Sequence, residues 1–165
     1  MIVVVVGVSA SGKSTLGAAL AAALGWEFIE GDDFHPPGNV AKMRRGVPLN
    51  DADREPWLAD VNRRIVQVDA AGKDAVLACS ALTRRYRDVL RRGIRDIRFV
   101  YLCGDPELIR ARMQGRQGHF MPAGLLDSQI ATLEPPDNAV LVRIDLPTRQ
   151  QVAVVLQALA LESDT

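Results

Sequence analysis

Eight residues near the start of the chain have the types and spacing of a phosphate-binding loop. The segment Gly7-Val-Ser-Ala-Ser-Gly-Lys-Ser14 fits the pattern G-x-x-x-x-G-K-[ST] at every position. Such a loop turns its backbone N–H groups inward around a phosphate, and glycine permits the dihedral angles that this requires. We expect Lys13 to reach the β- and γ-phosphates of a nucleotide and the Ser14 hydroxyl to ligate Mg²⁺. The segment predicts binding of a nucleoside triphosphate with magnesium.

The same loop predicts which residues hold ATP, but it does not say where the phosphoryl group goes. The expected nucleotide-binding residues are Gly7, Val8, Ser9, Ala10, Ser11, Gly12, Lys13, Ser14 and Thr15. No Asn-Lys-x-Asp sequence, the guanine-reading element of GTPases, occurs in the chain. This disfavours a GTPase, and the chain is too short for a motor or AAA-type module. The small phosphotransferases, which move the γ-phosphoryl group to a bound acceptor, remain.

A second group of polar residues follows the next predicted strand, in Glu30-Gly-Asp-Asp-Phe-His-Pro36. Ligands of open parallel sheets bind beyond the carboxyl ends of the strands. Glu30 and Asp32 are two positions apart, so in an extended chain they project to the same side. We expect Glu30 to hold a magnesium-bound water and Asp32 to orient and deprotonate an attacking hydroxyl. Asp33 is adjacent, and the sequence does not decide which aspartate is the base.

Cations follow on a long connection that we take as the acceptor-binding excursion, about residues 31–55. A kinase of a small anion needs cations to hold it, and arginine can grip a carboxylate with two hydrogen bonds. We therefore expect Arg54 to bind the carboxylate or hydroxyls of the acceptor. Lys42 and His35 are weaker candidates for the same task.

A short basic segment later in the chain, about residues 112–122, has the composition of a lid. Arg112 and Arg116 are four positions apart, so they share one face if the preceding helix extends that far. Mobile arginines that close over the nucleotide would stabilise charge on the transferring phosphoryl group and exclude water. We expect Arg112 and Arg116 to close over the nucleotide in this way. We assign no proton-transfer role to His119.

Short β-branched runs alternate with helical stretches along the chain. The predicted strands are Ile2–Val6, Glu27–Glu30, Ala75–Cys79, Ile97–Leu102 and Ala139–Ile144. The predicted helices are Lys13–Leu24, Asp51–Ala71, Thr83–Arg92, Asp105–Gln114, Leu125–Leu133 and Pro147–Leu161. This alternation is typical of βαβ units, which form a parallel sheet with helices on both faces. We therefore predict a single α/β domain, residues 1–165, with a P-loop.

The composition narrows the class of partner. The 165 residues include 20 Lys and Arg against 20 Asp and Glu, so the formal net charge is zero, which argues against nucleic acid or an anionic membrane as a partner. No apolar run reaches the ~20 residues of a membrane span. Cys79 and Cys103 each end an apolar run and are typical of small buried residues in a reducing compartment. We expect a cytoplasmic protein.

Several further segments give the chain a family resemblance that extends over nearly its whole length. They are Gly7–Ser14, Glu30–Pro36, Asn39–Met43, Gly46–Trp57, Cys79–Leu82, Tyr86–Asp88, His119–Pro122 and Leu133–Pro135. With them the sequence resembles the gluconate kinases of the thermoresistant gluconokinase family, small P-loop sugar-acid kinases. The phosphate loop is shared by a vast superfamily, whereas the His-Pro, Pro-Leu-Asn-Asp-x-Asp-Arg-x-Pro-Trp and His-Phe-Met elements are much narrower. The sequence departs from the family's pattern at Ala10, where glycine is more usual, and at Glu30, where aspartate also occurs.

The resemblance implies a nucleoside-monophosphate-kinase-like fold with a five-stranded parallel sheet. It also implies a cytoplasmic enzyme, often a homodimer, that converts ATP and D-gluconate to ADP and 6-phosphogluconate. Two alternatives stay open. The same fold could act on another small acceptor such as shikimate or a nucleotide, although a base-stacking site would predict an excursion richer in aromatic residues. A non-catalytic ATP-binding module would predict loss of Lys13 or of the acidic element, and the chain keeps both.

Overall fold

The sheet at the centre of the molecule has five parallel strands. In the computed structural model, which describes residues 1–115 and 123–163, they lie in the order β2-β3-β1-β4-β5. Their bounds are β1 (Ile2–Val6), β2 (Glu27–Glu30), β3 (Ala75–Ala78), β4 (Ile97–Cys103) and β5 (Ala139–Arg143). Every residue of the central strand β1 is buried, as in parallel strands covered on both faces. The predicted five-stranded parallel sheet is confirmed.

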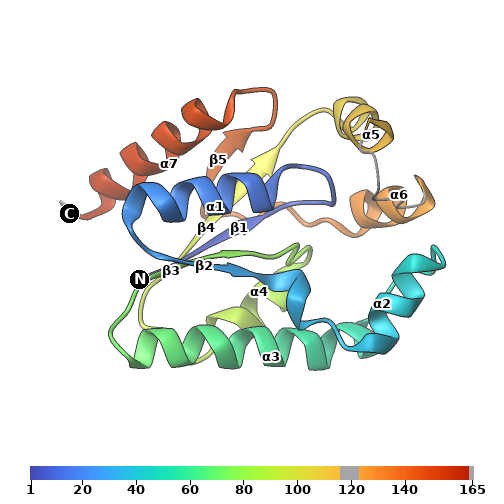
Figure 1. The fold of residues 1–165 in the computed structure, drawn as a ribbon, viewed down its shortest axis with the longest axis horizontal. Helices are drawn as coiled ribbons and strands as arrows, with labels where there is room; N and C mark the ends of the chain where they lie inside the picture. Colours follow the sequence, from blue (N-terminus) through green and yellow to red (C-terminus); the bar gives the residue numbers. More distant parts are fainter. Residues whose placement is uncertain (116–122, 164–165) are drawn as a thin grey trace.

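Helices cover both faces of this sheet. Their bounds are α1 (Lys13–Leu24), α2 (Pro37–Arg44), α3 (Asp51–Ala70), α4 (Arg84–Arg91), α5 (Pro106–Gln114), α6 (Ala123–Thr132) and α7 (Thr148–Ser163). Helices α1 and α7 lie on one face and α3 and α4 on the other, while α2, α5 and α6 gather near the carboxyl ends of the strands (Figure 1). None of the helices in the described part of the chain is long and apolar enough to cross a membrane.

Local sequence sets the helix boundaries. Helix α3 begins after Asn50, whose side chain accepts a 2.8 Å hydrogen bond from the backbone N–H of Asp53. The Asp53 carboxylate accepts a 3.0 Å bond from the backbone N–H of Asn50 in return, which completes a capping box. Asp105 caps α5 by accepting a hydrogen bond from the backbone N–H of Glu107 at 2.8 Å. The predicted strands and helices are confirmed, with boundaries to within two residues.

The connection after β2 differs from the prediction. The extended geometry expected for Glu30 and Asp32 was wrong, because Gly31–Phe34 form a 3₁₀ helix, η1. The backbone N–H of His35 donates to the Asp32 carbonyl at 3.2 Å and closes this turn. Helix α2 follows directly and begins with Pro37, whose missing N–H is harmless in a first helical turn. The excursion is therefore largely helical.

The expected lid is described only in part. Helix α5 ends at Gln114, with Gly115 as its C-cap. Arg116 and His119 lie outside the described residues.

Candidate active site

The phosphate loop joins the buried end of β1 to the first turn of α1. Gly7 and Gly12 have φ angles of 154° and 102°, in the region that favours glycine. A Cβ atom on Gly7 would also lie 2.9 Å from the Ser11 hydroxyl oxygen and 3.3 Å from the Leu102 carbonyl oxygen. Ala10 has a φ of 62°, so this departure from glycine is accommodated in the left-handed region.

The start of α1 is arranged to receive an anion. Its N-cap Gly12 contributes no side-chain hydrogen bond, and the first turn holds no acidic residue. The first N–H groups and the partial positive charge of the helix are therefore directed at whatever lies in the loop. Ser14 and Thr15 are exposed there, whereas the Ser11 hydroxyl is buried beside Gly7. The Lys13 ammonium is folded over the loop and donates to the Val8 carbonyl at 2.9 Å.

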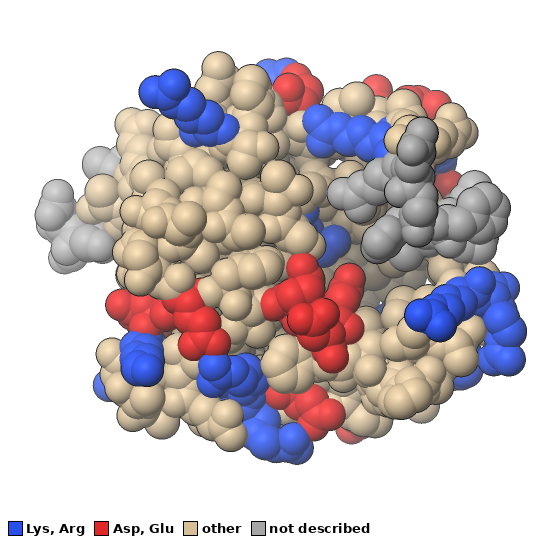
Figure 2. Space-filling model, in the orientation of Figure 1, with Lys and Arg blue, Asp and Glu red and all other residues tan. Residues whose placement is uncertain are grey.

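A cavity runs from the phosphate loop to the acidic element and the start of α3. Its polar lining consists of Ser9, Lys13, Asp32, His35, Arg54, Ser80, Ser128 and Gln129. Figure 2 shows carboxylates gathered beside a hollow in this face of the molecule, with Lys or Arg atoms visible inside it. The structure thus brings together Lys13, Asp32 and Arg54, which the sequence places on three separate segments. The Asp32 side chain is 67% exposed and accessible from the cavity.

Two of the expected site residues do not line this cavity. The Lys42 ammonium donates to both carboxylate oxygens of Asp53, at 2.7 and 2.8 Å. This hydrogen bonding holds the pKa of Asp53 below its ordinary value and braces α2 against α3. Glu30 is half-buried and precedes η1 as its N-cap residue. Neither Lys42 nor Glu30 is among the residues that line the cavity.

Trp57 fixes the acidic element against α3. Its indole N–H donates to the Gly31 carbonyl at 2.8 Å. Its ring stacks on His35, with the ring centroids 4.1 Å apart and the planes 17° from parallel. Trp57 is 1% exposed. The same side chain therefore belongs to the core and holds the turn that carries Asp32.

Arg54 is held by a tyrosine that the sequence analysis did not assign to the site. One terminal nitrogen of Arg54 donates to the Tyr86 hydroxyl at 3.1 Å, and its guanidinium carbon lies 5.4 Å from the centroid of the Tyr86 ring. The Tyr86 hydroxyl donates in turn to Asp51. Burial is the main cause that raises the pKa of Tyr86, which keeps its hydroxyl protonated. Arg54 thus enters the cavity with a fixed orientation.

Helix α6 forms the opposite wall of the cavity. Hydrogen bonds attach this helix to the phosphate loop and the residues after it to the loop that follows β3. The backbone N–H of Ser9 donates to the Gln129 side-chain oxygen at 2.7 Å. Beyond the helix, the buried Arg87 donates to the carbonyls of Leu82 at 3.3 Å and of Glu134 at 2.8 Å. These bonds tie the residues after α6 to the loop that follows β3.

A second cavity, of about 290 Å³, adjoins the phosphate loop from the side of α7. It is lined by Ala10, Gly12, Thr15, Arg112, Thr148 and Gln151, among others. Arg112 donates to the Ile144 carbonyl at 2.6 Å, which places its guanidinium next to the loop. Arg110, by contrast, pairs with Glu107 and Asp127 at 2.6 and 2.9 Å.

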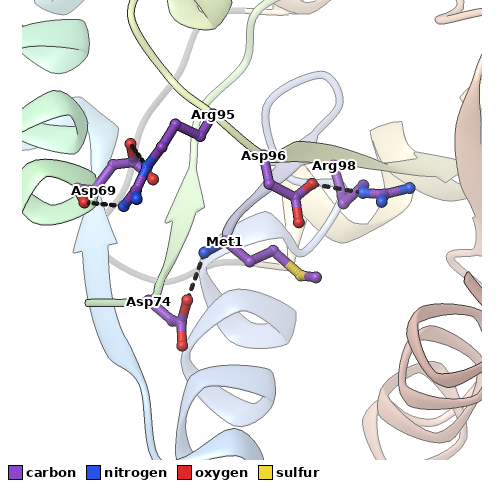
Figure 3. A network of polar contacts seen from close by, with 6 residues as sticks. All are labelled: Met1, Asp69, Asp74, Arg95, Asp96 and Arg98. Carbon is purple, nitrogen blue, oxygen red and sulfur yellow. Dashed lines mark hydrogen bonds and ion pairs between the residues drawn. The ribbon is translucent and has the colours of Figure 1, made fainter. Parts of the chain in front are cut away.

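A larger cavity, of about 670 Å³, lies at the amino ends of β4 and β5, but its arginines already have partners. Arg95 pairs with Asp69 at 3.1 Å and Arg98 with Asp96 at 2.8 Å (Figure 3). Arg91 lies over the Phe99 ring, 4.6 Å from its centroid. Because these cations are paired or stacked, the phosphate loop is the better anion site.

Comparisons with known proteins agree with this geometry. A family model described as "AAA domain" matches residues 2–136, so the chain is long enough for such a domain, contrary to the expectation from its length. A gluconokinase of Gluconobacter oxydans is 51% identical over 142 residues, which cover 86% of this chain and 80% of that protein. A probable gluconokinase of Rattus norvegicus is 45% identical, and the matched residues cover 96% of this chain and 97% of that protein. The crystal structure of a gluconokinase from Sinorhizobium meliloti superposes with a TM-score of 0.89 at 44% identity, over 98% of this chain and 93% of that one.

Proposed function

This chain belongs to the gluconokinase family, and from that premise we propose that it transfers the γ-phosphoryl group of ATP to D-gluconate. The products are ADP and 6-phospho-D-gluconate, and the enzyme is a phosphotransferase with an alcohol group as acceptor. The observation that carries the proposal is the cavity that Lys13, Asp32 and Arg54 share. An ammonium, a carboxylate and a guanidinium lie around one space, which supports their proposed roles in binding phosphate, accepting the proton and binding the acceptor carboxylate.

ATP lies with its phosphates in the loop of residues 7–15. Backbone N–H groups of Gly7 to Gly12 and the start of α1 surround the β- and γ-phosphates, and Lys13 moves from the Val8 carbonyl onto them. The γ-phosphate faces the cavity that holds Asp32, so the nucleoside extends the other way, into the second cavity beside Thr15 and Arg112. Arg112 and Arg116 close over the phosphates and exclude water.

The acceptor lies between α3 and α6. Arg54, fixed by Tyr86, binds the carboxylate of gluconate, and His35 is a further candidate to contact it. Asp32 accepts the proton of the primary hydroxyl as its oxygen attacks the γ-phosphorus. The new P–O bond forms while the bond to the β-phosphate oxygen breaks, and ADP leaves. Lys42 supports this site through Asp53 rather than by direct contact.

The residues present fit a magnesium ion. Mg²⁺ takes oxygen ligands, and it needs only one or two carboxylates where phosphates supply the rest. Ser14 offers an exposed hydroxyl oxygen in the first turn of α1, and Glu30 would hold a magnesium-bound water. When bound, the ion neutralises charge on the β- and γ-phosphates. No three metal-ligating side chains cluster within the described ranges, so the phosphates must contribute ligands.

The family resemblance also supports a homodimer in the cytoplasm, without a nucleic-acid or membrane partner. Sedimentation of the purified protein tests the dimer. The resemblance further supports treating residues 1–165 as one kinase domain.

Exchanging each aspartate of the acidic element for asparagine tests the assignment of the base. Asp32→Asn should lower kcat by about 10²- to 10⁴-fold, because an amide cannot accept the hydroxyl proton. Asp33→Asn is the matched control, since Asp33 is not among the residues that line the cavity. If Asp32→Asn changed only KM for gluconate, Asp32 would hold the acceptor and another group would be the base.

A further inference from the structure

His35 is built into the wall of the site and does not stand free in it. Its side chain is 5% exposed, and one face of its ring is covered by Trp57 at 4.1 Å. An imidazole held in this way can make directed hydrogen bonds with its two nitrogens, but it has little freedom to follow a substrate.

Asn39 determines which of these nitrogens carries the proton. The Asn39 amide nitrogen donates to the Asp53 carbonyl at 2.8 Å, and since a carbonyl can only accept, this contact identifies the NH₂ end of the amide. The same nitrogen lies 3.3 Å from His35 Nδ1. Its second hydrogen points there, so Nδ1 acts as an acceptor. The proton of the neutral ring is then on Nε2.

The ring is neutral at pH 7. Burial lowers the pKa of His35 below its ordinary value of 6.5. Two charged groups face it: Asp32 from η1 favours the imidazolium and Arg54 from α3 opposes it, and the net direction stays downward. A neutral imidazole with its proton on Nε2 can donate one hydrogen bond from that atom and cannot accept one there.

His35 Nε2 lies 3.7 Å from Asp32 Oδ1, and we propose that His35 is a positioning residue for Asp32. Its Nε2–H donates to one carboxylate oxygen, which turns the other oxygen toward the acceptor hydroxyl. This inference rests on the proposed role of Asp32 as the base. The distance exceeds the ~2.7–3.2 Å of a formed N–H···O bond, and such contacts tighten when the substrate complex forms. The hydroxyl proton passes to Asp32, and the His35 proton stays on Nε2.

The alternative role for His35, as a direct contact to the acceptor, predicts different kinetics. A residue that holds gluconate equally in the ground state and the transition state affects KM. A residue that directs the base affects kcat and leaves KM nearly unchanged. It also affects the pH dependence of kcat, because a donated hydrogen bond favours the charged form of a carboxylate.

Two variants separate the hydrogen bond from the packing. His35→Phe keeps a flat ring against Trp57 and removes the donor, whereas His35→Gln keeps an N–H donor near the position of Nε2. We expect His35→Phe to lower kcat by about 10- to 100-fold, the scale of a misdirected catalytic group. KM for gluconate should stay within about 2-fold, and the acidic limb of the kcat–pH profile should move to higher pH. His35→Gln should restore most of kcat.

Combining His35→Phe with Asp32→Asn tests whether His35 acts through Asp32. If His35 acts through Asp32, His35→Phe should cause little further loss in that background. A His35→Phe protein that binds ATP normally but shows a raised KM with unchanged kcat and pH profile would overturn the inference, as would failure of His35→Gln to restore a lost kcat. A normal kcat in Asp32→Asn alone would instead refute the assignment of the base. Thermal melting of each variant verifies that it is folded.

Discussion

The side-chain oxygen of Gln129 accepts a 2.7 Å hydrogen bond from the backbone N–H of Ser9. These residues are 120 positions apart, and the bond joins α6 to the phosphate loop. The wall of the acceptor cavity is therefore attached to the element that receives the nucleotide.

Gln129→Glu should weaken ATP binding more than Gln129→Ala does. Gln129→Ala loses a hydrogen bond worth about 1 kcal/mol, or about 5-fold in affinity. Gln129→Glu keeps an acceptor for Ser9 but adds a negative charge beside the phosphates, and we expect a loss of about 10-fold. Calorimetric titration with a non-hydrolysable ATP analogue measures both, with Thr132→Ala on the same helix as a control. Wild-type affinity in Gln129→Glu would show that this contact is remote from the bound phosphates.

Removing the Tyr86 hydroxyl should weaken binding of the acceptor. Tyr86→Phe keeps the buried ring and deletes the group that orients Arg54, so KM for gluconate should rise by about 3- to 10-fold. We expect kcat to stay within about 2-fold, since the reacting atoms are untouched. Arg85→Gln is the matched control, because Arg85 contacts Asp51 from an exposed position at 3.4 Å. A loss of kcat with unchanged KM would place Arg54 at the phosphoryl group.

Gly31 is required by close packing. A Cβ atom there would lie 2.6 Å from the Ala78 carbonyl oxygen and 3.2 Å from Cys79 Cβ. We expect Gly31→Ala to lower the free energy of unfolding by about 1–3 kcal/mol. Gly38→Ala in α2 meets no atom within 4 Å and should be neutral or stabilising by up to about 1 kcal/mol. Urea denaturation compares the two variants, and equal effects would contradict the packing at Gly31.

Protein stability should depend on His35 in mildly acidic solution. Because burial lowers the pKa of His35 below 6.5 in the folded chain, the unfolded chain takes up its proton first as the pH falls. The free energy of unfolding therefore decreases as the pH drops from about 6.5 through the pKa of the folded state. His35→Gln removes this contribution and should lose less stability than the wild type between about pH 7 and about pH 5.

Urea denaturation at several pH values tests this difference, and parallel curves for the two proteins would refute it. Other groups do not confuse the comparison. His119 is present in both proteins. The pKa values of Asp53, Asp69 and Asp145 are lowered from 3.8, so these carboxylates take up protons only at lower pH.

The sheet and the phosphate loop could be predicted from the sequence because their signals are local. A run such as Ile2–Val6 is apolar throughout, and the loop motif fixes its own backbone. Helix α2 could not be predicted, since its first turn contains Pro37 and Gly38 and its residues show no apolar periodicity. Contacts with α3 stabilise it, through Asn39 to the Asp53 carbonyl and Lys42 to the Asp53 carboxylate.

Part of the site was predictable for a similar reason. Asp32, His35 and Arg54 lie in segments with polar residues at expected strand ends, and the structure gathers them at one cavity. Tyr86 and Gln129 were missed because their roles depend on partners far away in the sequence. The type of residue alone gives no sign of such pairs. Lys42, in contrast, was expected to bind the acceptor, but its ammonium pairs with Asp53 on the neighbouring helix α3.

The initial rate of ADP formation with ATP and Mg²⁺ tests whether this protein phosphorylates D-gluconate. The acceptors to compare are D-gluconate, shikimate, a nucleoside monophosphate and none. We expect ADP formation that depends on D-gluconate and yields 6-phospho-D-gluconate in equal amount. Turnover with shikimate or the nucleotide instead, or ATP binding without any acceptor-dependent turnover, would contradict it.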